Sequence, residues 1–156
     1  MKRSILILLF AAAISFAGYG QDYKTALGLR AGVPYGATLK HFISKHNALE
    51  GILASRWSGL VITGLYENEN WLGSYPALNW YWGVGAHVGF WDQGMNPNVN
   101  TTYVGAVIGA DGVLGIEYTF EDFPINLSLD LLPTLNVIGY TGWGGINGAF
   151  SIRYVF

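Results

Sequence analysis

The feature that most constrains this chain is a strict two-residue alternation in its last seven residues. Every second position from 150 to 156 holds a large apolar residue, and the positions between hold Ser151, Arg153 and Val155. Successive side chains of a β-strand leave opposite faces of the sheet. The pattern therefore predicts a strand with one wholly apolar face and one face that carries an arginine.

Seven further segments alternate in the same way, with turn-forming residues between them. The predicted strands cover residues 25–31, 37–44, 48–57, 60–67, 78–91, 103–120, 125–131 and 150–156. The longest predicted connections are 68–77, 92–100 and 133–145. Eight strands of these lengths predict an all-β fold, an eight-stranded antiparallel up-and-down barrel that crosses a membrane.

Composition indicates whether this sheet faces water or lipid. Charged residues make up 12% of the chain, about half the usual share for a soluble domain, and aromatic residues make up 15%. After the N-terminal region there is no run of about 18 apolar residues, which excludes membrane-spanning helices. Because every backbone polar group must be paired inside lipid, a closed barrel is the remaining way to cross it.

The first 20 residues have the three parts of a secretory signal peptide. Two basic residues stand near the start, residues 5–17 form the apolar part, and small residues follow. We expect cleavage after Gly20, with cleavage after Ala17 as the alternative, so that residues 21–156 form the mature barrel. The mature chain then carries six basic and ten acidic residues, a balance that argues against nucleic-acid binding.

The polar faces of the predicted strands carry nearly balanced charge. The interior of an eight-stranded barrel is just wide enough for side chains, and unpaired charge there is costly. We therefore expect a filled lumen rather than a pore. The residues expected in this polar network are Arg30, Lys40, Glu50, Arg56, Glu67, His87, Asp111, Glu117, Asp130 and Arg153.

Aromatic residues gather near both ends of the apolar faces. Two aromatic girdles with aliphatic residues between them are typical of a surface that faces lipid. A soluble lipocalin-like barrel alternates as well, but its apolar face points inward. The aromatic residues expected at the two membrane interfaces are Trp57, Trp80, Phe90, Tyr118, Phe120, Tyr154 and Phe156.

The sequence offers little catalytic chemistry. His87, Ser128 and Asp111 share the polar face and suggest a triad, but a hydrogen-bonded interior is the better interpretation, because a catalytic site also needs substrate access. The three histidines lack the spacing of metal ligands, and the chain has no cysteine. We expect no catalytic residues, no bound metal and no cofactor.

Four short segments carry a family resemblance: residues 39–42 (LKHF), 48–52 (ALEGI), 64–67 (GLYE) and 114–120 (LGIEYTF). With these segments and an aromatic final residue, the mature chain resembles the small eight-stranded outer-membrane barrels of the OmpA/OmpX type. The resemblance implies a place in the outer membrane of a Gram-negative bacterium, in contact with outer-membrane lipid. It also implies that the barrel-assembly machinery reads the C-terminal strand ending at Phe156.

The resemblance implies a structural or surface-contact role without a defined reaction. A surface ligand would then bind through the predicted loops 92–100 and 133–145. Three other functions remain open. A lipid A-modifying enzyme would keep catalytic His and Ser residues at its rim or in its outer loops, and those two loops contain neither. A narrow channel would conduct ions, and a secreted lipocalin-like carrier would dissolve without detergent.

Overall fold

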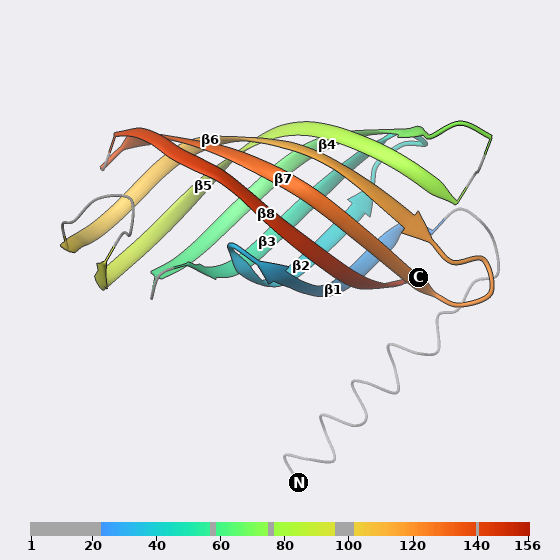
Figure 1. Ribbon diagram of the computed structural model, residues 1–156, viewed down its shortest axis with the longest axis horizontal. Helices are drawn as coiled ribbons and strands as arrows, with labels where there is room; N and C mark the ends of the chain where they lie inside the picture. Colours follow the sequence, from blue (N-terminus) through green and yellow to red (C-terminus); the bar gives the residue numbers. More distant parts are fainter. Residues whose placement is uncertain (1–22, 57–58, 75–76, 96–101, 140) are drawn as a thin grey trace, which may run out of the picture.

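The computed structural model describes residues 23–56, 59–74, 77–95, 102–139 and 141–156, which form eight antiparallel strands closed into one barrel (Figure 1). Each strand pairs with the next along the chain, and the last pairs with the first. The strands are β1 (Thr25–Gly32), β2 (Tyr35–Phe42), β3 (Asn47–Arg56), β4 (Gly59–Trp71), β5 (Leu78–Met95), β6 (Thr102–Thr119), β7 (Ile125–Ile138) and β8 (Gly142–Val155). The predicted all-β, eight-stranded antiparallel barrel is thus confirmed for the described residues.

No helix in the described part of the chain is long and apolar enough to span a bilayer. The predicted signal peptide, residues 1–20, lies outside the described residues.

The predicted loop 133–145 is wrong, since β7 continues to Ile138 and β8 already begins at Gly142. Pro133 suggested a break because proline cannot donate to a strand ladder. The sheet nevertheless keeps Pro133 in β7, one residue away from a shift of the β7–β8 register, where Gly144 has no partner in β7. Such bulges are the places where a sheet tolerates proline and an extra residue.

Two other predicted connections are also shorter than expected. β4 continues to Trp71, so the connection predicted at 68–77 begins only after that residue. Asn68 and Asn70 stand where the alternation predicts apolar side chains, which hid the strand, but Asn68 Nδ2 donates to Asn47 Oδ1 at 2.8 Å across the β3–β4 pair. β5 continues to Met95, and residues 96–100 of the predicted loop 92–100 lie outside the described residues.

The wall of the barrel is uneven in height. β5 and β6 have 18 residues each, whereas β1 and β2 have 8. The last residue of β1, Gly32, pairs with Ala149, so β8 extends well beyond the β1–β2 hairpin (Figure 1). The connections β2–β3, β4–β5 and β6–β7 lie at the same end of the barrel as the C-terminus, which we call the terminal end.

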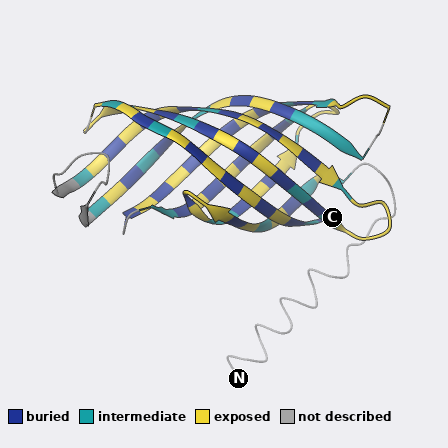
Figure 2. Cartoon of the chain, in the orientation of Figure 1, coloured by how far each residue is buried: buried dark blue, intermediate teal, exposed yellow. Residues whose placement is uncertain are grey.

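The two faces of the sheet are chemically opposite, and Figure 2 shows them as alternating buried and exposed bands along the strands. Outward side chains are mostly large and apolar; Leu29 is 67% exposed and Leu129 is 57% exposed. Inward side chains include Lys40 and Arg153, which are almost completely buried. A one-residue slip of any strand would exchange these two sets, which makes the register strongly determined.

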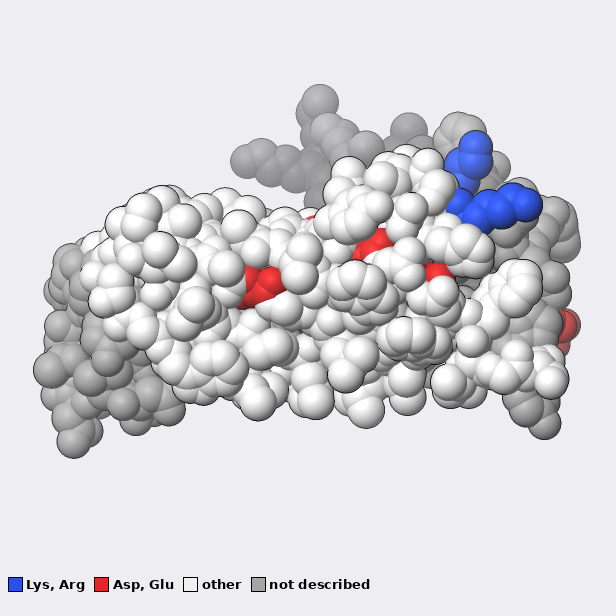
Figure 3. Space-filling view, turned by 90° about the horizontal axis from the view of Figure 1, so that it is seen from above, with Lys and Arg blue, Asp and Glu red and all other residues white. Residues whose placement is uncertain are grey.

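The exposed charges lie together at the terminal end. Among the residues whose burial is described, the exposed charged ones are Lys24, Lys45, Glu121 and Asp122. The side of the molecule in Figure 3 is mostly uncharged, with basic residues at one end and a few small acidic patches over the middle. The outer wall of the described barrel is therefore an apolar belt.

The structure places most of the predicted interface aromatics on this belt. Trp57 lies outside the described residues. Tyr118 and Phe120 stack edge to face at the terminal end, with ring centroids 4.9 Å apart. The exposed members of the predicted set are Phe90, Tyr118, Phe120 and Phe156, and the half-buried members are Trp80 and Tyr154.

Amide hydrogen exchange distinguishes the observed β7–β8 hairpin from a loop. We expect the amides of Leu135 and Asn136 to exchange much more slowly than those of residues 121–123, because the hairpin residues pair with neighbours on both sides while the turn residues do not. Native-state exchange followed by NMR measures both sets in one sample. Equal rates would contradict the extended hairpin.

Candidate functional site

The lumen of the barrel is filled by polar side chains. Of the ten residues expected there, Arg56 is half-buried, and its Nη2 donates to the backbone oxygen of Gly144 at 2.8 Å. The other nine are buried: Arg30, Lys40, Glu50, Glu67, His87, Asp111, Glu117, Asp130 and Arg153.

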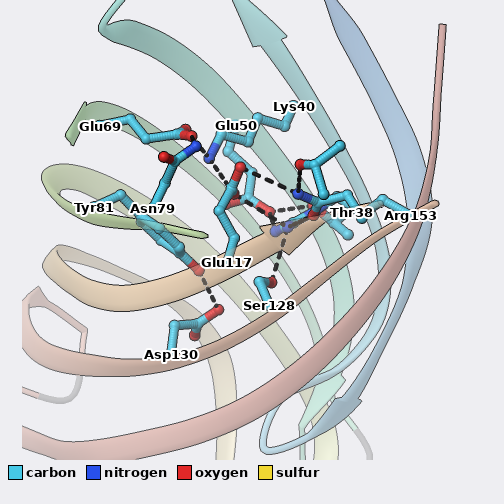
Figure 4. A network of polar contacts seen from close by, with 12 residues as sticks. Thr38, Lys40, Glu50, Glu69, Asn79, Tyr81, Glu117, Ser128, Asp130 and Arg153 are labelled. Carbon is cyan, nitrogen blue, oxygen red and sulfur yellow. Dashed lines mark hydrogen bonds and ion pairs between the residues drawn. The ribbon is translucent and has the colours of Figure 1, made fainter. Parts of the chain in front are cut away.

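Lys40 is the centre of a cluster of acids near the terminal end (Figure 4). Its Nζ lies 2.7 Å from Glu117 Oε2, 3.0 Å from Glu69 Oε2 and 3.1 Å from Glu67 Oε2. Two strands besides β2 supply these groups, β4 and β6, because alternate residues of each point to the axis. One ammonium group thus forms ion pairs with three carboxylates.

Arg153 joins its own strand β8 to β3 and β7 in the same cluster. Its Nη2 lies 2.6 Å from Glu50 Oε1, and its Nη1 donates to Ser128 Oγ at 2.8 Å and to Asn126 Oδ1 at 3.1 Å. The Thr38 hydroxyl also donates to Glu50 Oε1. The guanidinium of β8 therefore connects β3 to β7 across the lumen.

A second pair crosses the barrel beside this cluster. The Arg30 guanidinium makes a two-point contact with the Asp130 carboxylate, and the Tyr81 hydroxyl donates to Asp130 Oδ2 at 3.0 Å. Lys40 Nζ lies 4.4 Å from the centre of the Tyr81 ring. Gly115 leaves space for this ring, since a Cβ there would lie 2.5 Å from Tyr81 Cζ.

Apolar side chains separate the acid cluster from a smaller polar group. Ile52, Leu65, Val113 and Leu132 belong to one buried hydrophobic cluster. On its own strand, each of these residues lies farther from the terminal end than a buried carboxylate residue. Beyond this apolar layer, His87 Nδ1 lies 2.8 Å from Asp111 Oδ1, and His87 Nε2 lies 3.1 Å from Asn136 Oδ1.

His87, Ser128 and Asp111, considered from the sequence as a triad and interpreted as part of a hydrogen-bonded interior, do not come together as a triad. Ser128 is held by Arg153 on the terminal side of the apolar layer, whereas His87 and Asp111 pair on the other side. Among the described residues, no three His, Cys, Asp or Glu side chains are placed to hold a metal ion.

Two members of the network, Glu69 and Tyr23, lie outside the strands predicted from the sequence. Glu69 was assigned to a connection, although it continues the inward phase of Glu67, and that phase was the available signal. Tyr23 precedes β1, and its hydroxyl donates to Glu117 Oε1 at 2.8 Å. Burial, together with the charge of Glu117, raises the pKa of the Tyr23 phenol well above its usual value, so Tyr23 keeps the proton that it donates.

A cavity of about 630 Å³ opens at the terminal end, beside the acid cluster. Its lining combines exposed basic residues, aromatic rings and the buried Glu69. The lining residues are Tyr23, Lys24, His41, Phe42, Ile43, Ser44, Lys45, His46, Glu69, Trp71, Asn79 and Thr119.

Removing the Arg153 charge should be strongly destabilising. Arg153→Gln leaves Glu50 buried without its closest cation, so we expect a loss of roughly 3–5 kcal/mol in the free energy of unfolding. Lys45→Gln, at an exposed site, serves as the control and should cost less than about 1 kcal/mol. Urea titration of the folded barrel measures both, and similar losses would show that the interior charges are not coupled to stability.

Comparisons with known proteins found no match that describes this site. No family model matches the chain, no curated protein matches it, and no solved structure matches it. The assignment of the fold as an eight-stranded antiparallel barrel therefore rests on the strand pairing itself.

Proposed function

We propose that this chain is an integral outer-membrane β-barrel of a Gram-negative bacterium, with a filled polar lumen and a structural or surface-contact role without catalysis. In this proposal, residues 1–20 direct export and are removed, and residues 21–156 form the mature barrel. The barrel belongs to the small OmpA/OmpX type, and the assembly machinery reads its C-terminal strand.

The observation that carries the proposal is the direction of the two faces. Apolar side chains cover the outer wall, and charged side chains of both signs are buried around the axis. A soluble barrel has the opposite arrangement, because its outer face meets water and its interior is apolar. An apolar belt around a closed sheet suits the hydrocarbon of a bilayer, in which no backbone polar group remains unpaired.

The positions of charges and aromatic rings support an orientation. The exposed charged residues whose burial is described lie at the terminal end, the same end at which Tyr118 and Phe120 stack. This end would lie at the periplasmic interface, where both termini of such barrels are found. The longer side, β5 to β8, would then extend toward the cell surface. A surface contact would involve the ends of its hairpins, because most of the predicted loop 133–145 belongs to β7 and β8.

Membrane fractionation with a matched pair of variants tests the location. We expect the protein and Phe123→Arg to remain in the outer-membrane fraction after a carbonate wash and to migrate differently on gels before and after heating. Leu129→Arg should fail to assemble, because an arginine near the midplane of the belt costs roughly 2–4 kcal/mol, whereas Phe123 lies in the exposed β6–β7 turn. A soluble pool of the unmodified protein would refute the proposal.

Planar-bilayer recording tests the filled lumen. We expect no steady conductance from the purified barrel, because ion pairs and the layer of Ile52, Leu65, Val113 and Leu132 occupy the interior. Reproducible single-channel steps that disappear with denatured protein would instead favour a narrow channel.

A further inference from the structure

The floor of the terminal-end cavity is acidic. Glu69, only 6% exposed, lines the cavity, and its Oε1 accepts a hydrogen bond from Asn79 Nδ2 at 2.7 Å. Its Oε2 lies 3.0 Å from Lys40 Nζ, which Glu67 and Glu117 also contact. The buried Oδ1 of Asn79 has no hydrogen-bond partner among the described residues. The floor therefore presents acceptors that a ligand with N–H donors could use.

The acid cluster also has too little positive charge. The cations Lys40 and Arg153 contact four carboxylates, those of Glu50, Glu67, Glu69 and Glu117. With all six groups ionised, two negative charges are uncompensated inside the barrel. Buried charge without a partner is costly, so a positive group placed against Glu69 would stabilise the cluster.

The walls of the cavity suit an organic cation. Tyr23, Phe42 and Trp71 contribute aromatic rings to the lining, and the rings of Tyr23 and Phe42 meet edge to face at a centroid distance of 5.2 Å. Aromatic faces attract ammonium groups. Since no described set of side chains is placed to hold a metal ion, an alkyl ammonium fits this lining better than a metal does.

The rim has the opposite charge. Lys24 and Lys45 are exposed and both line the cavity, as does the hydroxyl-bearing Ser44. Ile43 and Trp71, also part of the lining, are 53% and 69% exposed, so the mouth continues onto an apolar surface. The cavity thus runs from an acidic floor through aromatic walls to a basic rim beside apolar side chains.

We propose that this cavity binds the headgroup of an aminophospholipid, with its ammonium at Glu69 and its phosphate between Lys24 and Lys45. The acyl chains would leave over Ile43 and Trp71 toward the apolar belt. The volume, about 630 Å³, lies in the usual range of small-molecule sites. The lipid source rests on the proposed function, which places this end of the barrel in the inner leaflet of the outer membrane.

The test measures headgroup binding to the folded mature barrel in dodecyl maltoside, a detergent without phosphate or amine. Dihexanoyl phosphatidylethanolamine carries both charges, dihexanoyl phosphatidylglycerol lacks the ammonium, and O-phosphoethanolamine lacks the acyl chains. Amide NMR shifts report the site and the affinity of each probe. Because binding is measured on purified folded protein, its outcome is separate from that of membrane fractionation.

We expect saturable shifts at the cavity-lining residues 41–46, Glu69, Trp71 and Asn79, with the phosphatidylethanolamine bound roughly tenfold or more tightly than the phosphatidylglycerol. Glu69→Gln should remove this preference by weakening phosphatidylethanolamine binding, while Lys40 keeps the carboxylates of Glu67 and Glu117. Replacing both Lys24 and Lys45 by Gln should weaken both lipids. Asp122→Asn, an exposed change at the same end but outside the cavity lining, is the matched control.

Three results would overturn the proposal. Equal affinity of the unmodified barrel for the two lipids, or an unchanged preference in Glu69→Gln, would show that no ammonium reaches the floor. If O-phosphoethanolamine binds as tightly as the lipid, the lipid source is wrong and a soluble phosphate ester is the occupant. Heat-dependent gel migration of every variant establishes that a loss of binding is not a loss of folding.

Discussion

The structure depends on ion pairs that reach across the barrel axis. Arg30 contacts Asp130, Lys40 contacts Glu117 and Arg153 contacts Glu50, and the partners in each pair are 77 or more residues apart in sequence. None of these pairs can form on a single hairpin, because each joins strands that meet only when the sheet closes. Pairing of the interior charges and closure of the barrel are therefore one event.

Such pairs need not add much net stability, because removing two charges from water costs nearly as much as their attraction returns. Their main effect is to exclude other registers of the strands. A slipped register would turn Asp130 or Arg153 outward among the apolar side chains and would leave its partner alone in the lumen. The interior charges thus select one register for every strand that they join.

The interior is also divided along the axis. The layer of Ile52, Leu65, Val113 and Leu132 separates the acid cluster from the pair of His87 and Asp111. The excess of carboxylates lies on the side of this layer that faces the terminal end, where Glu69 borders the cavity. Electrostatic imbalance and access therefore occur at the same place, and this coincidence is the basis of the headgroup site.

Sequence alone determined the strands, their alternation and the sorting of residues between two faces, because side-chain direction in a strand follows from position parity and needs no tertiary information. The predicted strand ends were wrong where polar residues occupy outward positions, as at Asn68 and Asn70, and where Pro133 suggested that the strand ends. Only the closed structure decided which inward residues meet. That Ser128 binds Arg153 instead of His87, and that Glu69 and Tyr23 join the Lys40 cluster, depends on the stagger of eight strands around an axis, which no local pattern encodes.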